Sequence, residues 1–135
     1  LLNGIAHAEL TNLRVAQCDV FDLLAALPAA SLAGVSVFFP DPWPKKRHHK
    51  RRLLQAAFFA AVARVLRRDG QVFVATDWAN YAEDVAALVE TLPAWRNLAG
   101  PGRTAPRNKA RILTKFERRA LREGRTVADF VFALR

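Results

Sequence analysis

The sequence predicts an α/β fold in which helices cover a mostly parallel sheet. Short apolar runs rich in Val and Phe alternate along the chain with longer segments of helical periodicity. Three of these runs are followed within two residues by an acid, namely Asp19, Asp41 or Asp77. Acids often do no more than end a strand, but ligands of open sheets bind beyond the strand ends, so the three carboxylates are expected around one crevice. The 135 residues are 52% hydrophobic, which is enough for one compact domain.

The first third of the chain predicts two strands and a brief helix. Leu13 to Cys18 (LRVAQC) is a short apolar-rich run that predicts a strand, in which Cys18 is a buried small apolar residue. Asp22 to Leu27 predicts a helix that Pro28 stops. Gly34 to Phe39 (GVSVFF) is continuously apolar, β-branched and aromatic, which is typical of a strand buried on both faces of a parallel sheet.

The middle of the chain predicts a rigid loop, a long helix and another strand. Pro40 to Pro44 is expected to be a stiff, extended loop, because each proline lacks a backbone donor and restrains the residue before it. Lys50 to Arg67 is the strongest predicted helix, and Asp69-Gly70 ends it. Gln71 to Thr76 (QVFVAT) then predicts a second buried strand. Apolar residues recur at helical spacing in the helix: Leu54, Phe58, Ala61, Val62 and Val65.

The last part of the chain predicts two helices and two strands. Trp78 to Leu92 is a predicted helix, Trp95 to Leu98 a short strand, and Ala99 to Lys109 an exposed loop rich in Gly, Pro and Arg. Thr114 to Glu123 predicts a basic helix that starts with the Thr and Glu spacing of a capping box and is closed by a glycine. Val127 to Leu134 predicts a terminal, antiparallel strand.

The charge is strongly basic and unevenly distributed. Lys plus Arg total 21 against 12 Asp plus Glu, which gives a formal net charge of +9. Lys45 to Arg52 (KKRHHKRR), here called the basic segment, has six basic side chains and no acid, and Arg103 to Arg135 has ten against three acids. If the fold brings these segments together, they form one phosphate-binding face, which favours a nucleic-acid partner. The alternatives are a solvated charge run or an adapter at an anionic membrane, and the latter lacks an exposed amphipathic helix.

Cysteine content and hydropathy suggest a cytoplasmic protein. The single cysteine excludes an intrachain disulfide and a cysteine-based zinc cage, which suits a reducing compartment. The apolar runs are too short to span a bilayer, and Leu1 to Glu9 lacks the basic start and long apolar stretch of a secretory signal. Because the sequence contains no Met, even at position 1, we expect it to be a fragment or a processed piece.

The stretch from Phe38 to Arg52 has the most specific chemistry in the chain. Asp41 is held between two prolines at a strand end, Trp43 offers a flat apolar face, and the basic segment that follows can neutralise phosphates. An acid and an aromatic surface beside a cationic cradle suit a base drawn out of its stack, and the N1 and N2 donors of guanine can both point at one carboxylate. His48 and His49 lack a third nitrogen or sulfur ligand nearby, so no metal is expected.

At this point the sequence resembles a known family, the tRNA (guanine-N7-)-methyltransferases of the bacterial single-subunit type. The family signature is similar to FPDPWPKKRHHKRR (Phe39 to Arg52). The next block of the family is similar to ATDW (Ala75 to Trp78) with Tyr81-Ala82-Glu83, and its C-terminal block is similar to TKFERR (Thr114 to Arg119). The resemblance runs from about Leu10 to Arg135. It implies a Rossmann-like class I methyltransferase sheet, S-adenosylmethionine as methyl donor without a metal, and a guanine of the tRNA variable loop as acceptor.

The resemblance also implies roles for particular residues. Asp19 is placed near the adenine of the donor, and Asp41 at the reaction centre beside both donor and guanine. Lys45 and Asp77 are implied substrate contacts. The implied tRNA-interacting run is Arg47, His48, His49, Lys50, Arg51 and Arg52, and a further substrate-binding segment is Thr114, Lys115, Phe116 and Glu117. The expected partner is tRNA, with no membrane, and the protein is expected to be a monomer or a weak homo-oligomer.

The N-terminal part of the family pattern is missing from the sequence. The family opens with a strand and a Gly-rich turn for the methionine portion of the donor, then a second strand whose acid binds the ribose. Here Gly4 stands alone, and Gly100 and Gly102 lie in the predicted loop. The chain therefore starts just before the third strand of the family, and the absent strands would lie between that strand and the fourth. We expect these 135 residues alone to bind the donor poorly, and the alternative function is a non-catalytic, basic RNA-binding module.

Overall fold

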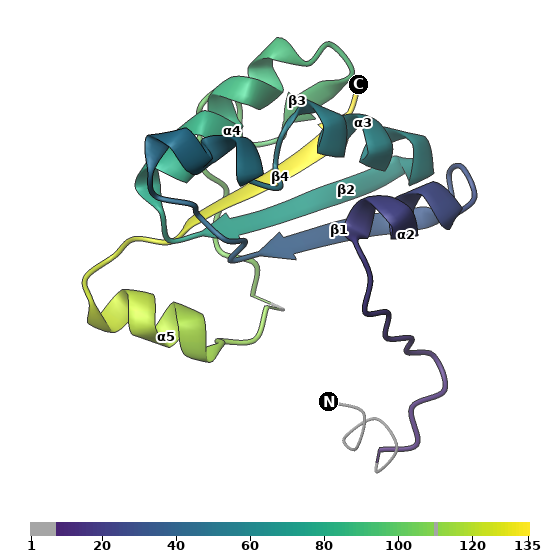
Figure 1. Ribbon diagram of the computed structural model, residues 1–135, viewed down its shortest axis with the longest axis horizontal. Coiled ribbons are helices and arrows are strands. Elements are labelled where there is room, and N and C mark those ends of the chain that lie inside the picture. The colour runs from purple at the N-terminus through teal and green to yellow at the C-terminus, as the bar shows by residue number, and fades with distance from the viewer. Residues whose placement is uncertain (1–7, 110) are drawn as a thin grey trace.

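The computed structural model describes residues 8–109 and 111–135, which form a four-stranded sheet flanked by helices (Figure 1). The strands are β1 (Leu32–Phe38), β2 (Leu66–Thr76), β3 (Trp95–Asn97) and β4 (Ala128–Leu134), in the order β1-β2-β4-β3. β1 and β2 are parallel, and β4 runs antiparallel to both β2 and β3. The other three strands share one direction, which confirms the predicted mostly parallel sheet with an antiparallel C-terminal strand.

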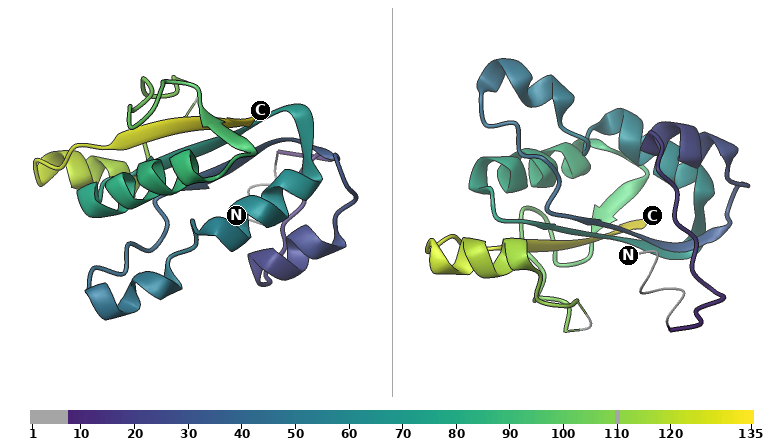
Figure 2. Two further views of the ribbon diagram at one scale, coloured as in Figure 1. Left: turned by 90° about the horizontal axis from the view of Figure 1, so that it is seen from above. Right: turned by 60° about the horizontal axis from the view of Figure 1, so that its bottom comes forward.

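The helices occupy two different places relative to the sheet. They are α2 (Val20–Ala26), the 3₁₀ helix η1 (Lys46–Arg51), α3 (Ala56–Val65), α4 (Ala79–Thr91) and α5 (Lys115–Arg122). Figure 2 shows α2, α3 and α4 on one side of the sheet. α5 instead lies beside the carboxyl ends of β1 and β2 (Figure 1). Two basic parts of the sequence, η1 and α5, are thus both near this end of the sheet.

Aromatic side chains form the centre of the core between the helices and the sheet. The ring of Phe59 on α3 is fully buried and meets Trp95 of β3 at 5.3 Å and Phe132 of β4 at 5.8 Å between centroids, both edge to face. Burying a side chain of this size contributes about 1.5–3 kcal/mol. These contacts fix α3 against the C-terminal half of the sheet, and therefore fix the direction of the chain that leads into α3.

The predicted strand at Leu13 to Cys18 is wrong. These residues have no regular structure, and residues 8–19 are exposed throughout, including Cys18, which was expected to be buried. A strand needs a neighbour for its backbone N–H and C=O groups. None of the four described strands pairs with this segment, so it remains irregular.

The prediction that Gly34 to Phe39 is buried on both faces is also wrong, although the strand itself is confirmed as β1. Val35 and Val37 are half-buried, whereas Gly34, Ser36 and Phe38 between them are exposed. Within the described residues β1 pairs only with β2, so it is an edge strand. Its apolar sequence suits a central parallel strand, but only one of its faces is covered by helices.

The predicted helix from Lys50 to Arg67 begins too early and ends too late. Lys50 belongs to η1, α3 starts at Ala56, and Leu66 already pairs with Leu32 as the first residue of β2. Contacts with α4 hold the preceding segment out of the helix. The backbone N–H of Leu54, for example, donates to the hydroxyl of Tyr81 at 3.0 Å.

The remaining predicted elements are confirmed, and α2 starts two residues before the predicted Asp22. β2 starts five residues before the predicted Gln71, so Asp69-Gly70, which was expected to end the helix, lies inside the strand. α4, β3 and β4 fall within the expected ranges. At α5 the Thr114 side chain accepts a hydrogen bond from the N–H of Glu117 at 3.3 Å, and Gly124 takes a φ of +72° after the helix, where glycine is favoured. The Pro40 to Pro44 loop is irregular but not extended throughout, because Trp43 has a φ of +42°.

None of the helices in the described ranges is long and apolar enough to cross a membrane. The expectations for Leu1 to Glu9 and Gly4 fall mainly on residues 1–7, outside those ranges.

Candidate functional site

The site starts at the loop that leaves the carboxyl end of β1. The N–H of Phe39 donates to the carbonyl of Ala75 on β2 at 2.8 Å, which fastens the first residue of the loop to the sheet. Phe39 and Trp43 both have positive φ angles, +52° and +42°, which side chains of this size rarely adopt. Such strain persists only where surrounding contacts enforce it, and it is common at functional sites. The result is a sharp corner with the exposed Asp41 at its centre.

A cavity of about 290 Å³ brings Asp41 together with two other parts of the chain. The β1 loop, the start of α4 and the α5 region each contribute to its wall. Phe116 on α5 is 60% exposed and offers its ring to this space. The lining residues are Phe39, Pro40, Asp41, Pro42, Asp77, Trp78, Phe116, Arg119 and Arg125. Asp41 and Asp77 therefore share one cavity, as the sequence predicted.

Asp77 is held by a chain of ion pairs from the C-terminal region. Arg125 Nε donates to Asp77 Oδ2 at 2.8 Å, and Arg125 also pairs with Glu123. Arg119 Nε in turn donates to Glu123 Oε1 at 2.7 Å, and this bond holds the pKa of the Glu123 carboxyl below its usual value. Asp77 thus keeps one carboxylate oxygen for a ligand. In the sequence, Arg119 is marked only as part of the TKFERR motif, and Arg125 carries no local signal.

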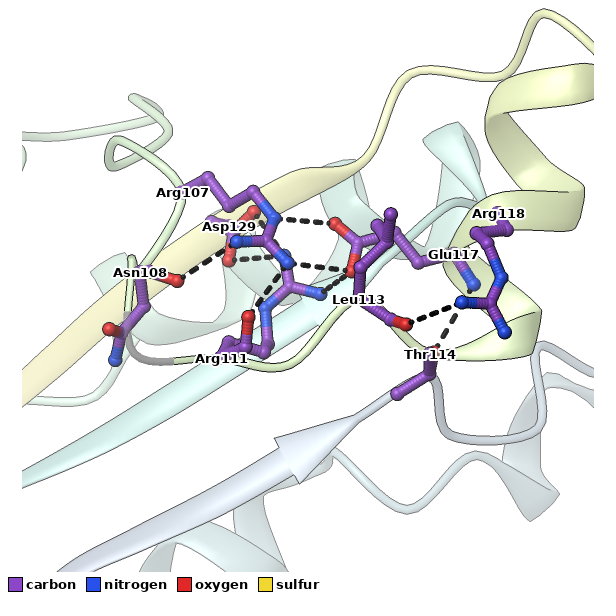
Figure 3. Close-up of polar contacts among 8 residues, drawn as sticks. All are labelled: Arg107, Asn108, Arg111, Leu113, Thr114, Glu117, Arg118 and Asp129. Carbon is purple, nitrogen blue, oxygen red and sulfur yellow. Dashed lines mark hydrogen bonds and ion pairs between the residues drawn. The ribbon is translucent and has the colours of Figure 1, made fainter.

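A buried ionic cluster attaches α5 to the sheet (Figure 3). Arg111 NH1 donates to Glu117 Oε2 at 2.7 Å, and Arg111 NH2 donates to Asp129 Oδ2 at 3.0 Å. Arg107 Nε donates to the second oxygen of Glu117 at 2.8 Å. The Arg107 bond is the main cause of the lowered pKa of Glu117, whereas burial raises the pKa of Asp129. Both oxygens of the Glu117 side chain are therefore engaged, and the side chain is 2% exposed.

Arg111 links this cluster to the Asp41 corner. Its guanidinium carbon lies 5.5 Å from the ring centroids of both Phe38 and Phe39, at the end of β1. Arg111, Arg107 and Asp129 were not singled out from sequence, where they counted only toward the charge of the C-terminal region. Their pairing depends on contacts that no local pattern reveals.

The basic segment is mostly free to meet a polyanion. Lys45 precedes η1 and is exposed, as are Arg47, Lys50 and Arg51. Arg51 lies over the Trp43 ring at 5.0 Å from its centroid, and His48 meets the ring edge-on at 5.9 Å. These contacts position one flat side chain among several cations next to the Asp41 corner.

Two members of the basic segment are tied to α4. His49 Nδ1 lies 3.7 Å from Asp84 Oδ2, and Arg52 is buried against the same carboxylate. Among the described residues, no group of three or more His, Cys, Asp and Glu side chains could hold a metal ion.

Asp19 lies apart from Asp41 and Asp77. It caps α2, with its Oδ1 accepting from the N–H of Phe21 at 2.7 Å. It lines a separate cavity of about 410 Å³, together with residues that include Lys50, Arg51 and Gln55. The expected crevice with three carboxylates therefore contains two, because the segment before Asp19 is not part of the sheet.

A cavity with two acids beyond the carboxyl ends of parallel strands is typical of the ligand sites of open α/β sheets such as the Rossmann-like fold. A family model described as "Putative methyltransferase" matches residues 1–130. The tRNA (guanine-N(7)-)-methyltransferase of Ectopseudomonas mendocina is 48% identical over 98% of this chain and 56% of its own length. Those of Nitrosospira multiformis and Halorhodospira halophila are 50% and 48% identical over 98% of this chain, and 57% and 61% of their own lengths. The chain belongs to this methyltransferase family and spans a little over half the length of these relatives.

Proposed function

We propose that the protein to which this chain belongs transfers a methyl group from S-adenosylmethionine to N7 of a guanine in tRNA. The observation that carries this proposal is the cavity shared by Asp41, Asp77 and Phe116, whose wall also includes the cations Arg119 and Arg125. The basic segment follows the Asp41 corner directly in the chain. The proposal includes a cytoplasmic location and a monomer or weak homo-oligomer, in keeping with the family.

The shared cavity suits one flat base. Its volume of about 290 Å³ lies just below the range of pockets that hold drug-sized ligands. Phe116 supplies a ring on which a base can stack, and the carboxylates of Asp41 and Asp77 can accept from guanine N1 and N2. A guanine held by its N1 and N2 edge keeps N7 free on the opposite edge, so recognition does not block the reacting atom.

The chemistry requires alignment more than proton transfer. S-adenosylmethionine, when bound, would supply a methyl group on a sulfonium. Guanine N7 would form the new bond to this carbon with its lone pair as the carbon–sulfur bond breaks, and sulfur would leave with the electron pair as a neutral thioether. N7 has no proton to lose, so no general base is needed, and the purine gains a positive charge. Asp41 next to the reacting base is therefore an orienting and electrostatic group, whose negative charge stabilises the cation that forms.

The described residues fit only part of the donor. Asp19 and Asp41 are the two acids proposed to hold it, near the adenine and at the reaction centre respectively. They line different cavities, and none of the glycines at positions 34, 70, 100, 102 and 124 forms a strand-to-helix turn for the methionine portion. We therefore propose Asp19 and Asp41 as donor contacts of the complete protein.

The cations around the cavity are proposed to hold the tRNA backbone. Lys45 and the exposed members of the basic segment follow the Asp41 corner in the chain, and Lys115 is in the first turn of α5, next to the cavity residue Phe116. Phosphate neutralisation by such groups releases counterions, so binding should weaken steeply with salt. Thr114 and Glu117 contribute by holding α5 in place, through the helix cap and the buried cluster.

Asp41→Ala in the complete gene product tests the proposal. N7-methylguanine, measured by reductive cleavage of tRNA after incubation with the donor, should vanish. Affinity for tRNA should change by less than about threefold, or roughly 0.7 kcal/mol, because Asp41 carries no phosphate contact. Asp69→Ala is the matched control, since Asp69 is an exposed acid near the amino end of β2 and should leave methylation unchanged. Salt-dependent tRNA binding by the unsubstituted protein without any N7-methylguanine would instead favour the RNA-binding module.

A further inference from the structure

Arg52 differs from the other cations of the basic segment. Its side chain is 3% exposed, whereas the adjacent Arg51 is exposed. All three guanidinium nitrogens have partners. Nε donates to the carbonyl of Pro42 at 2.8 Å, NH2 donates to Asn80 Oδ1 at 3.1 Å, and NH1 pairs with Asp84.

The surroundings of Arg52 hold both its side chain and its backbone. The guanidinium carbon lies 4.7 Å from the ring centroid of Tyr81 on α4, a cation–π contact. Gln55 Nε2 donates to the Arg52 carbonyl at 2.9 Å and to the His49 carbonyl at 3.2 Å. To reach a phosphate, Arg52 would have to give up three hydrogen-bond partners and its contact with the Tyr81 ring. Asp84 is 49% exposed and also lies 3.7 Å from His49, so the cost falls on the buried guanidinium, whose donors would lose their partners.

The Asp41 corner has few other attachments of this kind. Pro40 and Pro42 have no N–H to donate, so the corner relies on Phe39 at its start and on the Pro42 carbonyl at its end. The Pro42 carbonyl belongs to the residue directly after Asp41, and its partner Arg52 is ten residues further along the chain. The planar fork of arginine suits this task, because it can bind a loop carbonyl and two α4 side chains at once.

We propose that Arg52 is a positioning residue that fastens the Asp41 corner to α4 through Asp84 and Asn80, and not one of the RNA contacts of the basic segment. We call this set of Arg52 contacts the brace. Its importance for methyl transfer rests on the proposed function. Its existence is independent of that function and can be measured without RNA or methyl donor.

The first test follows Trp43, the neighbour of Pro42, by ¹⁹F NMR of the 135-residue chain labelled with 5-fluorotryptophan. Arg52→Lys keeps the charge but has a single nitrogen that cannot reach all three partners of the guanidinium, and Asp84→Asn removes the negative charge with which NH1 pairs. Both should shift or broaden the Trp43 resonance, assigned with Trp43→Phe. The resonance of Trp95, buried in the core, should stay in place and report intact folding. Arg47→Lys is the matched control on an exposed cation and should leave Trp43 unchanged. An unaltered Trp43 resonance in Arg52→Lys overturns the inference.

The second test compares the salt dependence of tRNA binding in Arg52→Gln and Arg47→Gln. Losing one phosphate contact lowers the slope of log K against log salt by about 0.7–0.9. We expect that loss for Arg47→Gln and an unchanged slope for Arg52→Gln. An equal loss in both variants means that Arg52 contacts RNA, and the inference fails. If Arg52→Gln does not fold, Arg52→Lys takes its place. The inference is then overturned if this variant keeps full tRNA affinity and its Trp43 resonance is unchanged. Absence of tRNA binding by the unsubstituted chain would count against the proposed function, while the NMR test would still decide the brace.

Discussion

At the scale of single residues, burial determines what a charged side chain does. Arg51 and Arg52 are adjacent in a run of cations, yet one lies exposed over Trp43 and the other is buried against Asp84. A buried charge must be paired, whereas an exposed one keeps its field available to a polyanion. The same distinction applies to Glu117, which the resemblance places in a substrate-binding segment and whose carboxylate is occupied by two arginines.

The exposed cations should act on RNA through their charge alone. Lys45→Ala is expected to lower the slope of log K against log salt for tRNA binding by about 0.7–0.9, and to weaken binding to the same extent for any RNA sequence. The measurement is a titration of labelled tRNA at several salt concentrations. Arg68→Ala removes the same charge from an exposed position at the amino end of β2 and should leave the slope unaltered. Equal slopes for Lys45→Ala and the unsubstituted chain would show that Lys45 is not at the interface.

At the scale of elements, α5 is attached to the molecule by ion pairs instead of an apolar face. It has eight residues, of which Glu117 and Ala120 are buried, while Phe116 and Leu121 are 60% and 54% exposed. A helix this short is marginal by itself and needs tertiary contacts. The buried cluster and the Thr114 cap supply them, and they leave the Phe116 ring facing the shared cavity. This attachment should therefore depend on the ionisation of Glu117.

Glu117→Gln should lower the free energy of unfolding by about 3 kcal/mol at pH 7, since it removes one of the two carboxylates that pair with the buried Arg111, together with the pair to the exposed Arg107. The pKa of Glu117 is lowered in the folded state, so its contribution is complete above the unfolded pKa of about 4.3 and is lost as pH falls through the lowered value. The difference in the free energy of unfolding between the variant and the unsubstituted chain should therefore shrink below about pH 4.3. Urea unfolding from pH 7 to pH 3 measures it.

Two comparisons make this pH prediction specific. Asp129 has a raised pKa and acts in the opposite direction, but it is present in both proteins. Glu123→Gln, which breaks an exposed pair, should cost no more than about 1 kcal/mol. If the difference in the free energy of unfolding between Glu117→Gln and the unsubstituted chain stays constant or widens in acid, the Glu117 charge does not have this role.

At the scale of the whole molecule, the fold brings together the residues proposed to bind the guanine, but not those proposed to bind the methyl donor. The ends of β1 and β2, the start of α4 and α5 surround one cavity with Asp41 and Asp77. Asp19 faces another cavity, and within the described residues β1 has a free edge. The carboxylates proposed to contact the donor are therefore not assembled into one site.

S-adenosylmethionine should consequently bind this 135-residue chain with a dissociation constant weaker than about 1 mM, or roughly −4 kcal/mol. Isothermal titration calorimetry should give heats equal to those of dilution, both for the unsubstituted chain and for Asp19→Ala. The complete gene product serves as the positive control. Micromolar binding to the 135-residue chain, lost in Asp19→Ala, would show that the donor site is already complete.

Local chemistry made much of the fold and site predictable. The prolines around Asp41, the periodicity of α4 and the cap of α5 depend on neighbouring residues, and all three were found from sequence. The errors lie where long-range contacts decide. Leu13 to Cys18 has strand-like residues without a partner strand, and the α3 helix starts late because the segment before it is bonded to α4.

By itself the sequence determined the α/β class, the acid at the corner after β1 and the dense positive charge beside it, because these follow from residue types a few positions apart. Only the tertiary structure decided which charges are free. Asp84, which pairs with Arg52, and Asp77, which pairs with Arg125, lie 32 and 48 residues away from these arginines, and Arg111 pairs with Asp129 on β4. Pairing over such separations is set by the packing of helices against the sheet, and burial then engages the Arg52 side chain with three partners while the adjacent Arg51 stays exposed.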